Sequence, residues 1–166
     1  MGGNSDLLCD EFMRGTLESG NNVEKIRIAD KDIAYCKGCY YCRTSGGVCA
    51  IKDDMLDLLV KIIQADVIVL ATPVYFYSVS AQLKIVIDRT VARWREVKDK
   101  DFYFIITCGD NDISSCETTL TALRGYIACV SGAKEKGIIY GVGVYDKGEI
   151  KNTKAIIDAY EMGRNV

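Results

Sequence analysis

Four cysteines with short, regular spacing are the residues best suited to chemistry in this chain. Cys36, Cys39, Cys42 and Cys49 form the pattern C-x2-C-x2-C-x6-C. Three thiolates separated by two residues can reach three corners of a cubane, and a fourth can close the site, as in [4Fe-4S] loops. Structural zinc usually uses two C-x2-C pairs further apart and is the second choice. Free thiols in a reducing compartment are the remaining alternative.

An aromatic segment follows the apolar run 67–71. It reads Thr72-Pro73-Val74-Tyr75-Phe76-Tyr77-Ser78. The run is typical of a buried parallel strand, and open α/β sheets bind ligands beyond the carboxyl ends of such strands. The rings would flank a flat ligand ring, while Thr72, Ser78 and backbone amides would bond its polar edge. The alternative, which composition alone slightly favours, is an aromatic plug under a neighbouring loop or at a subunit interface.

The start of the chain carries a weaker signal. Gly2, Gly3, Asn4 and Ser5 precede or open an expected helix. Free N–H groups, the helix dipole and a hydroxyl together make an anion site, although most such starts are only helix caps. The acidic pair Asp53 and Asp54 is likewise interpreted as a helix cap.

Composition excludes several kinds of chemistry and partner. The 166 residues include no His, so no Cys-His or Ser-His nucleophile pair and no imidazole metal ligand can form. The formal charge of -2, without a basic block, argues against binding of nucleic acid. No apolar run is long enough to span a membrane and no secretory leader is recognisable, so we expect a cytoplasmic protein with reduced thiols and no membrane partner.

Hydrophobic periodicity predicts alternating helices and strands along the whole chain. The expected strands are 23–28, 67–71, 102–107 and 138–144, and the expected helices lie at about 5–19, 54–63, 83–94, 120–127 and 153–163. Strands separated by helices pair in parallel through right-handed crossovers. We therefore expect one domain, residues 1–166, with a doubly wound parallel sheet in three layers and a Cys-rich loop at about 30–50.

Several motifs together resemble the NADPH-dependent FMN reductase and iron-sulfur flavoprotein family. They are G-G-N-S-D-L-L, the Cys loop ending in C-A-I-K-D-D-M, A-D-V-I-V-L-A-T-P-V-Y-F-Y-S-V-S-A-Q-L-K and I-D-R-T. The resemblance covers nearly the whole chain. It implies a flavodoxin-like fold, bound FMN, dimers or tetramers, and electron transfer from NAD(P)H or another donor through the flavin.

The resemblance also implies roles for individual residues. Cys36, Cys39, Cys42 and Cys49 match the motif that holds a [4Fe-4S] cluster in the iron-sulfur members. The segment Pro73-Val74-Tyr75-Phe76-Tyr77 would contact the isoalloxazine and the ribityl chain, and Asn4 and Ser5 would lie on the phosphate.

The chain departs from the family at its start. The family begins with an apolar strand and a Gly-Ser-Pro-Arg type loop, and this sequence opens directly on the helix. The phosphate site would then keep only Gly3, Asn4 and Ser5, and the sheet would lack its central first strand. From this we expect weakened FMN binding and self-association through exposed sheet edges.

Two functions of different classes follow. The first is an FMN-dependent oxidoreductase, either an NAD(P)H-dependent FMN reductase or an iron-sulfur electron carrier with a redox protein as partner. The second is a flavin-free or degenerate scaffold whose Cys loop holds a structural metal or which serves as an interaction module. The retained aromatic and Cys loops favour the first.

Overall fold

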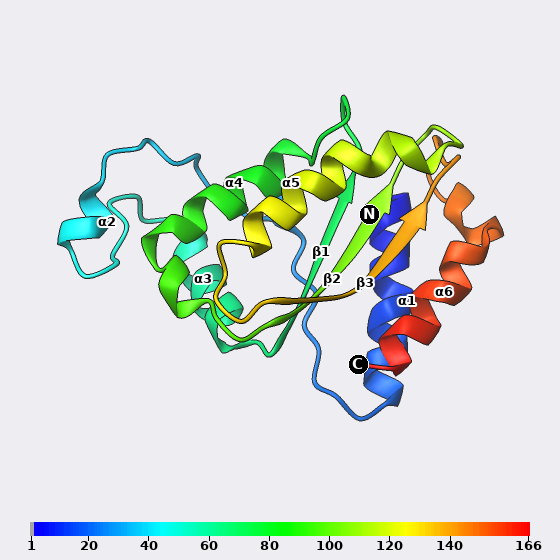
Figure 1. Cartoon of the computed structure of the whole chain (residues 1–166), viewed down its shortest axis with the longest axis horizontal. Helices are drawn as coiled ribbons and strands as arrows, with labels where there is room; N and C mark the ends of the chain where they lie inside the picture. Colours follow the sequence, from blue (N-terminus) through cyan, green and yellow to red (C-terminus); the bar gives the residue numbers. More distant parts are fainter. Residues whose placement is uncertain (1) are drawn as a thin grey trace.

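A parallel sheet of three strands forms the centre of the protein. The computed structural model describes residues 2–166 (Figure 1). The strands are β1 (Val67–Pro73), β2 (Asp101–Thr107) and β3 (Lys134–Gly141), in the order β1-β2-β3. β1 and β2 pair without a break, from Val67 opposite Asp101 to Pro73 opposite Thr107. Within the described residues β1 has no strand on its other side, so it forms one edge of the sheet.

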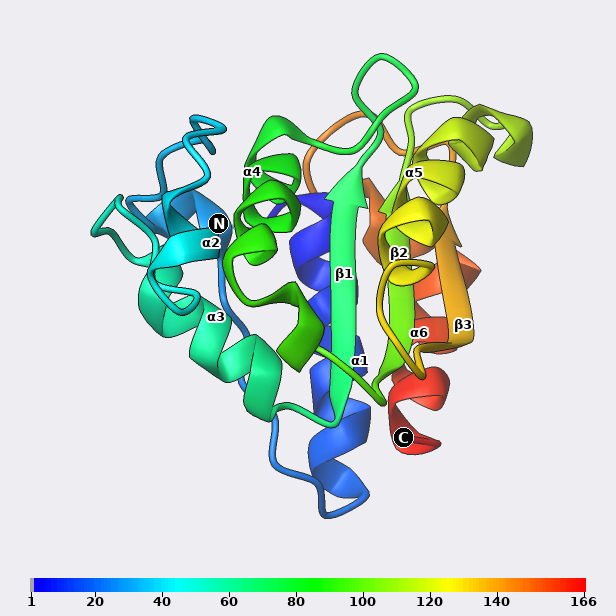
Figure 2. The ribbon, with the colours of Figure 1, turned by 60° about the vertical axis from the view of Figure 1, so that its left-hand side comes forward.

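Helices cover both faces of the sheet (Figure 2). α1 (Asn4–Glu18) and α6 (Lys154–Arg164) pack on one face, whereas α3 (Met55–Gln64), α4 (Ala81–Arg89) and α5 (Glu117–Ile127) pack on the other. The short helix α2 (Tyr41–Thr44) lies in the Cys loop. Single 3-10 turns span Ile28–Asp30, Thr90–Ala92, Trp94–Glu96, Ile113–Cys116 and Glu149–Asn152. The predicted doubly wound, three-layer α/β fold is confirmed.

Residues of β2 alternate between two apolar cores. Phe102, Phe104 and Ile106 belong to the core under α3, α4 and α5. Tyr103 and Ile105 belong to the core under α1 and α6. Successive side chains of a strand point to opposite faces, so a strand covered on both sides must be apolar throughout. That requirement explains why the uninterrupted apolar runs identified β1 and β2 in the sequence.

The strand expected over 23–28 is not formed. This segment pairs with no strand among residues 2–166 and turns into the 3-10 helix Ile28–Asp30. Its apolar Ile26 packs against the α3 side of the core, while Lys25 forms ion pairs of 2.5 Å with Asp6 and 2.6 Å with Asp10 on α1. The alternation of apolar and charged residues in this segment therefore reflects an extended chain with one apolar side toward the core and one charged side. It does not indicate hydrogen bonding to a neighbouring strand.

Two other boundaries differ from the prediction for local reasons. The helix expected over 83–94 ends at Arg89, and the Thr90 hydroxyl donates to the carbonyl of Ile87 at 2.7 Å where the chain leaves the helix. The strand expected over 138–144 is Lys134–Gly141. The apolar pattern did not indicate the first residues of this strand, Lys134-Glu135-Lys136, because they are charged. After the strand the chain bends at Gly143, where φ is +68°.

Helices α1 and α6 approach so closely that their backbones touch. A Cβ atom on Gly15 would lie 2.2 Å from the carbonyl oxygen of Tyr160, and one on Gly163 would lie 2.1 Å from that of Phe12. The Thr16 hydroxyl donates to the carbonyls of Phe12 at 2.9 Å and Gly163 at 3.2 Å. Only glycine fits at these two crossing points, which allows the close packing of α1 against α6.

We predict that Gly15→Ala destabilises the protein by about 2 kcal/mol, because the helices must separate to admit the methyl group. Gly125→Ala is the matched control in α5, where a Cβ would meet nothing within 4 Å. It should gain about 0.5 kcal/mol or more from helix propensity. Urea unfolding measures both. Equal stability of the Gly15 variant and the unsubstituted protein would contradict the close contact.

Candidate functional site

Three loops and one helix end gather at the carboxyl edge of the sheet. Because the strands are parallel, the loops 74–79, 108–116 and 142–148 leave the same edge. The start of α1 joins them, since the Ser5 and Thr107 hydroxyls are hydrogen-bonded at 2.7 Å. The glycine-rich start and the aromatic segment, which are about seventy residues apart in the sequence, therefore lie beside the same edge. This is the edge at which doubly wound proteins bind ligands.

The aromatic segment is a tight hairpin that projects beyond β1 (Figure 2). Tyr75 and Ser78 exchange backbone hydrogen bonds of 2.9 and 3.0 Å across the tip. Phe76 and Tyr77 occupy the tip with φ +49° and +60°, where bulky side chains are rarely found. Strain of this kind collects at binding and catalytic sites because the surrounding structure must hold it in place.

The three rings of the hairpin are exposed. Phe76 has 102% of its surface accessible, and Tyr75 and Tyr77 are more than half exposed. Among the residues that the structure describes, none buries these rings as the aromatic plug considered from the sequence. Exposed rings on a rigid turn offer a stacking surface for a flat ligand.

Thr72 fixes the base of the hairpin. Its side chain is fully buried, and its hydroxyl accepts from the N–H of Ser80 at 2.9 Å and donates to the carbonyl of Pro73 at 2.8 Å. The N–H of Val74 donates to the carbonyl of Thr107 at 2.7 Å and so continues the pairing of β1 with β2. In this structure Thr72 positions the loop, and the surface offered to a ligand consists of the residues beyond it.

The start of α1 has its side chains committed to neighbouring loops. The Asn4 amide donates to the carbonyl of Asp146 at 2.9 Å and accepts from the N–H of Gly148 at 3.0 Å. Gly3 is the helix N-cap and has no side chain to contribute. What remains for an anion is the set of backbone N–H groups in the first turn, with the Ser5 hydroxyl beside them.

Tyr145 is a candidate that the sequence patterns did not reveal. It lies in the third loop and is 89% exposed. Its ring packs against Gly109 so closely that a Cβ at Gly109 would lie 3.0 Å from the ring atom Cδ2. Gly143 and Gly148 on either side have positive φ angles. A tyrosine between two glycines after the last strand is the signal that could have indicated it.

The Cys loop has the donors of a metal site without its closed arrangement. Cys36 and Cys39 are exposed, Cys42 and Cys49 are half-buried, and all four are free thiols on a loop that lies well away from the sheet (Figure 1). Among residues 2–166, however, no three Cys, His, Asp or Glu side chains converge enough to hold a metal ion. Four thiols in one loop still match the chemistry of a soft metal or an iron–sulfur cluster.

For the other four cysteines, which lie on expected helix faces or at a strand end, the sequence predicts small core residues. Cys108 and Cys116 are buried and fit that interpretation. Cys9 is half-buried and Cys129 is exposed, so for Cys129 the expectation is wrong.

A buried ion pair closes the base of the Cys loop. Arg89 at the end of α4 donates to the two carboxylate oxygens of Asp53 at 2.7 and 2.9 Å, and to the carbonyl of Ala34 at 2.6 Å. Asp53 also accepts from the N–H groups of Ala34 at 2.9 Å and Met55 at 3.1 Å. Asp53 was interpreted only as a cap for α3. It also joins both ends of the loop to α4.

Hydrogen bonds keep Asp53 and Arg89 in their charged forms, although burial disfavours charge. Burial raises the pKa of Asp53, but the hydrogen bonds from Arg89, Ala34 and Met55 outweigh it and hold that pKa below its usual range. Burial lowers the pKa of Arg89, and the hydrogen bonds and charge of Asp53 raise it above its usual value. Both groups are therefore ionised at neutral pH.

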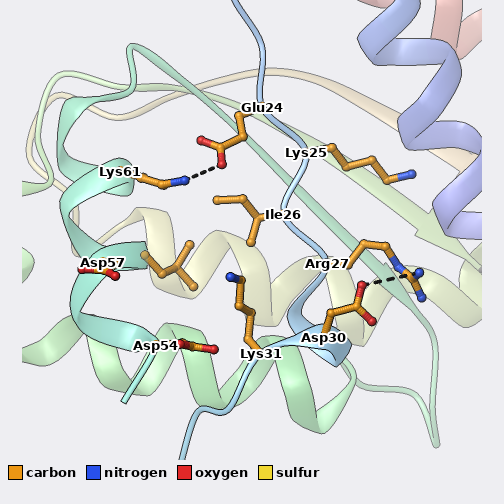
Figure 3. A pocket seen from close by; sticks show the side chains of 10 residues that line it. Glu24, Lys25, Ile26, Arg27, Asp30, Lys31, Asp54, Asp57 and Lys61 are labelled. Carbon is orange, nitrogen blue, oxygen red and sulfur yellow. Dashed lines mark hydrogen bonds and ion pairs between the residues drawn. The ribbon is translucent and has the colours of Figure 1, made fainter. Parts of the chain in front are cut away.

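A charged hollow of about 400 Å³ lies between the segment 24–31 and α3 (Figure 3). Glu24 forms an ion pair with Lys61 across it, and Arg27 pairs with Asp30 at 3.6 Å. The hollow shares no residue with the three loops at the carboxyl edge. Its opposite charges already neutralise each other, so we assign no ligand to it.

Three parallel strands between two helical layers, with binding loops gathered at their carboxyl edge, define a flavodoxin-like protein. The family model of NADPH-dependent FMN reductases matches residues 1–134, and the chain belongs to that family. The resemblance stated from the sequence motifs is thereby confirmed.

Individual relatives agree with this assignment. An iron-sulfur flavoprotein of Methanocaldococcus jannaschii is 44% identical over 88 residues, which is 53% of this chain and 45% of the relative. An iron-sulfur flavoprotein of Archaeoglobus fulgidus is 40% identical over 87 residues, which is 52% of this chain and 39% of the relative. The chain thus spans less than half the length of these two relatives.

Solved structures share the fold. An azoreductase from Bacillus anthracis has a TM-score of 0.78 at 16% identity and covers 98% of this chain and 92% of its own. An FMN-dependent NADH-azoreductase from B. anthracis, solved in complex with FMN, has a TM-score of 0.73 at 18% identity and covers 97% of this chain and 90% of its own. In the part of the chain that the structure describes, no helix is both long and apolar enough to cross a bilayer.

We predict that Asp53→Asn destabilises the protein by about 3 kcal/mol, because it leaves the charge of Arg89 buried without its partner. Asp57→Asn, at an exposed position in the first turn of α3, should change stability by less than about 0.5 kcal/mol. Chemical denaturation at pH 7 compares the two.

The same pair predicts a pH dependence. Because the pKa of Asp53 is lower in the folded state, its contribution is fully present above the unfolded pKa of about 3.9 and is lost as the pH falls through the folded value. Asp53→Asn should therefore show a smaller loss of stability on acidification below about pH 4. Parallel stability curves for the variant and the unsubstituted protein would contradict this.

Proposed function

We propose that this protein is an FMN-dependent oxidoreductase that accepts electrons from NAD(P)H. The observation that carries the proposal is the strained, exposed aromatic hairpin beside the start of α1, at the edge where this family's fold binds its ligand. Family membership supports the same activity. An azoreductase and a NAD(P)H:quinone oxidoreductase have the same fold as this chain, which is compatible with the proposal.

Within this proposal the chain's own residues bind and orient. Pro73, Val74, Tyr75, Phe76 and Tyr77 would contact the isoalloxazine, with Ser78 and loop amides at its polar edge. When bound, FMN supplies the hydride and electron chemistry, so the protein needs no acid or nucleophile of its own.

The phosphate of the flavin requires donors at a second place. Gly3, Asn4 and Ser5 would face it with the backbone N–H groups of the first helical turn. Because the Asn4 amide already holds the third loop, we expect that residue to serve the phosphate through its backbone.

For the Cys loop we propose a [4Fe-4S] cluster held by Cys36, Cys39, Cys42 and Cys49. The names of the relatives as iron-sulfur flavoproteins and the set of four free thiols support it. Left-handed backbone at Gly38, Tyr40, Gly46 and Gly47 permits the tight turns that closure of the loop requires. Zinc or an empty loop is the outcome that would replace this proposal.

Assembly, location and partner proteins belong to the proposal as well. We expect a homodimer or homotetramer in the cytoplasm that exchanges electrons with a redox protein. Exposed Tyr35, Tyr40 and Tyr41 on the Cys loop offer apolar surface for such contacts.

We predict that Tyr75→Ala combined with Tyr77→Ala raises the dissociation constant for FMN at least about tenfold, because each ring contributes roughly 1 kcal/mol of stacking. The melting temperature should hardly change, since both rings are exposed. Leu17→Ala, at an exposed position near the opposite end of α1, is the control and should leave FMN binding unaltered. An unchanged flavin titration with a sharply lower melting temperature would favour the flavin-free scaffold.

We predict that Cys39→Ser abolishes the brown absorbance and the iron content of anaerobically prepared protein while the far-UV spectrum stays that of folded protein. Cys129→Ser, at an exposed cysteine outside the loop, is the matched control and should retain both. Anaerobic protein that contains zinc or no metal at these four cysteines would overturn the cluster assignment.

A further inference from the structure

Lys147 is the single basic residue in the three loops at the carboxyl edge of the sheet. The loops 74–79 and 108–116 contain no Lys or Arg, and the third loop, 142–148, contains only this one. Its side chain is exposed, and none of the ion pairs formed among residues 2–166 uses it. The binding edge therefore carries one positive charge that no carboxylate of the described chain neutralises.

The Lys147 side chain lies against the start of α1. A Cβ atom on Gly2 would be 3.1 Å from its Cε and 3.8 Å from its Nζ. Gly2 has no side chain and thus leaves room for the lysine there. The ammonium stands at the positive end of the helix dipole, where a cation is unfavourable unless an anion lies between it and the helix. This placement points to an anionic ligand.

The loop that carries Lys147 is fixed on α1 by Asn4. The Asn4 amide donates to the carbonyl of Asp146 at 2.9 Å and accepts from the N–H of Gly148 at 3.0 Å. Both chain neighbours of Lys147 are thus held at the helix start. The Glu149 carboxylate accepts from two N–H groups of the same loop at 2.7 and 2.8 Å. The backbone of Lys147 therefore cannot move away from α1 without breaking these bonds.

The first turn of α1 offers N–H groups to the same space. Those of residues 3–5 donate to no acceptor among residues 2–166, as is usual for the first turn of a helix. The carboxylate of Asp6 accepts from the N–H of Gly2 at 2.7 Å and is ion-paired with Lys25 at 2.5 Å, so its charge is already compensated. Backbone N–H groups, the Ser5 hydroxyl and an ammonium form a donor set suited to a phosphate monoester.

We propose that Lys147 binds the phosphate of the flavin and supplies the positive charge that the start of α1 alone does not provide. The inference rests on the proposed flavin function, because the phosphate is that of FMN. A phosphate monoester carries about two negative charges at neutral pH. It therefore offsets both the ammonium and the positive end of the helix. Lys147 makes the site selective for FMN over riboflavin, which has the same ring system without the phosphate.

The experiment compares binding of FMN with binding of riboflavin. Full-length protein prepared without flavin is titrated with each, and quenching of flavin fluorescence gives the dissociation constants. Lys147→Gln removes the charge, and Lys147→Arg keeps it. Lys98→Gln is the matched control, since Lys98 is an exposed lysine just before β2, at the opposite edge of the sheet. Far-UV spectra and melting temperatures check that each variant is folded, as expected for substitutions at exposed positions.

We expect Lys147→Gln to raise the dissociation constant for FMN at least about fivefold, because a charge-assisted contact is lost. Its dissociation constant for riboflavin should stay within about twofold. Lys147→Arg and Lys98→Gln should bind both flavins within about twofold of the unsubstituted protein. Added salt should weaken FMN binding more in the unsubstituted protein than in Lys147→Gln, since ions screen an exposed charge.

The other outcomes separate this inference from the proposed function. Equal loss of FMN and riboflavin affinity in Lys147→Gln, or no loss of either, overturns the role of Lys147 and leaves the flavin proposal intact. Unchanged FMN binding with a lost preference between NADPH and NADH assigns Lys147 to the nucleotide phosphate and also overturns it. Unsubstituted protein that binds both flavins equally overturns the inference alone. Unsubstituted protein that binds neither flavin overturns the flavin function and the inference with it.

Discussion

The parallel pairing of β1 with β2 is the constraint on which the binding surface depends. Because the two strands run together from Val67 and Asp101 to Pro73 and Thr107, both end at the same level. The bond from Val74 to Thr107 carries the pairing one residue further, and Thr107 in turn holds Ser5. A shift of register would separate the aromatic hairpin from the start of α1, and the two candidate contact regions for one ligand would no longer face the same space.

The sequence predicted those helices and strands whose buried faces are marked by apolar residues in a regular pattern. Continuous apolar runs identified β1 and β2, and Met55, Leu58 and Leu59 at helical spacing identified α3. The segment 23–28 failed because alternation in an extended chain does not show whether a neighbouring strand exists. Periodicity measures which side of a segment is covered, whereas pairing depends on what lies beside it.

The candidate site shows the same division. Residue types marked the Cys loop and the aromatic segment, because thiols at short spacing and clustered rings are unusual wherever they occur. The ion pair of Asp53 with Arg89 was not predicted, because it depends on contacts between residues far apart in the chain, such as that between Ala34 and Arg89. The place of Tyr145 against Gly109 was missed for the same reason. Thr72 was expected at the ligand edge and instead holds the hairpin from beneath, a role that only its two hydrogen bonds reveal.

The clamp of Arg89 on Ala34 and Asp53 has a consequence for how this fold can diversify. It fastens the Cys loop at its two ends, so the interior of the loop is mechanically separate from the sheet. A longer interior costs little, since each doubling of loop length adds only about 0.6 kcal/mol of closure entropy. The length of the loop and its proposed metal-binding side chains can therefore change during evolution. The contacts of Arg89 with Ala34 and Asp53, and the binding surface at the carboxyl edge of the sheet, can stay the same.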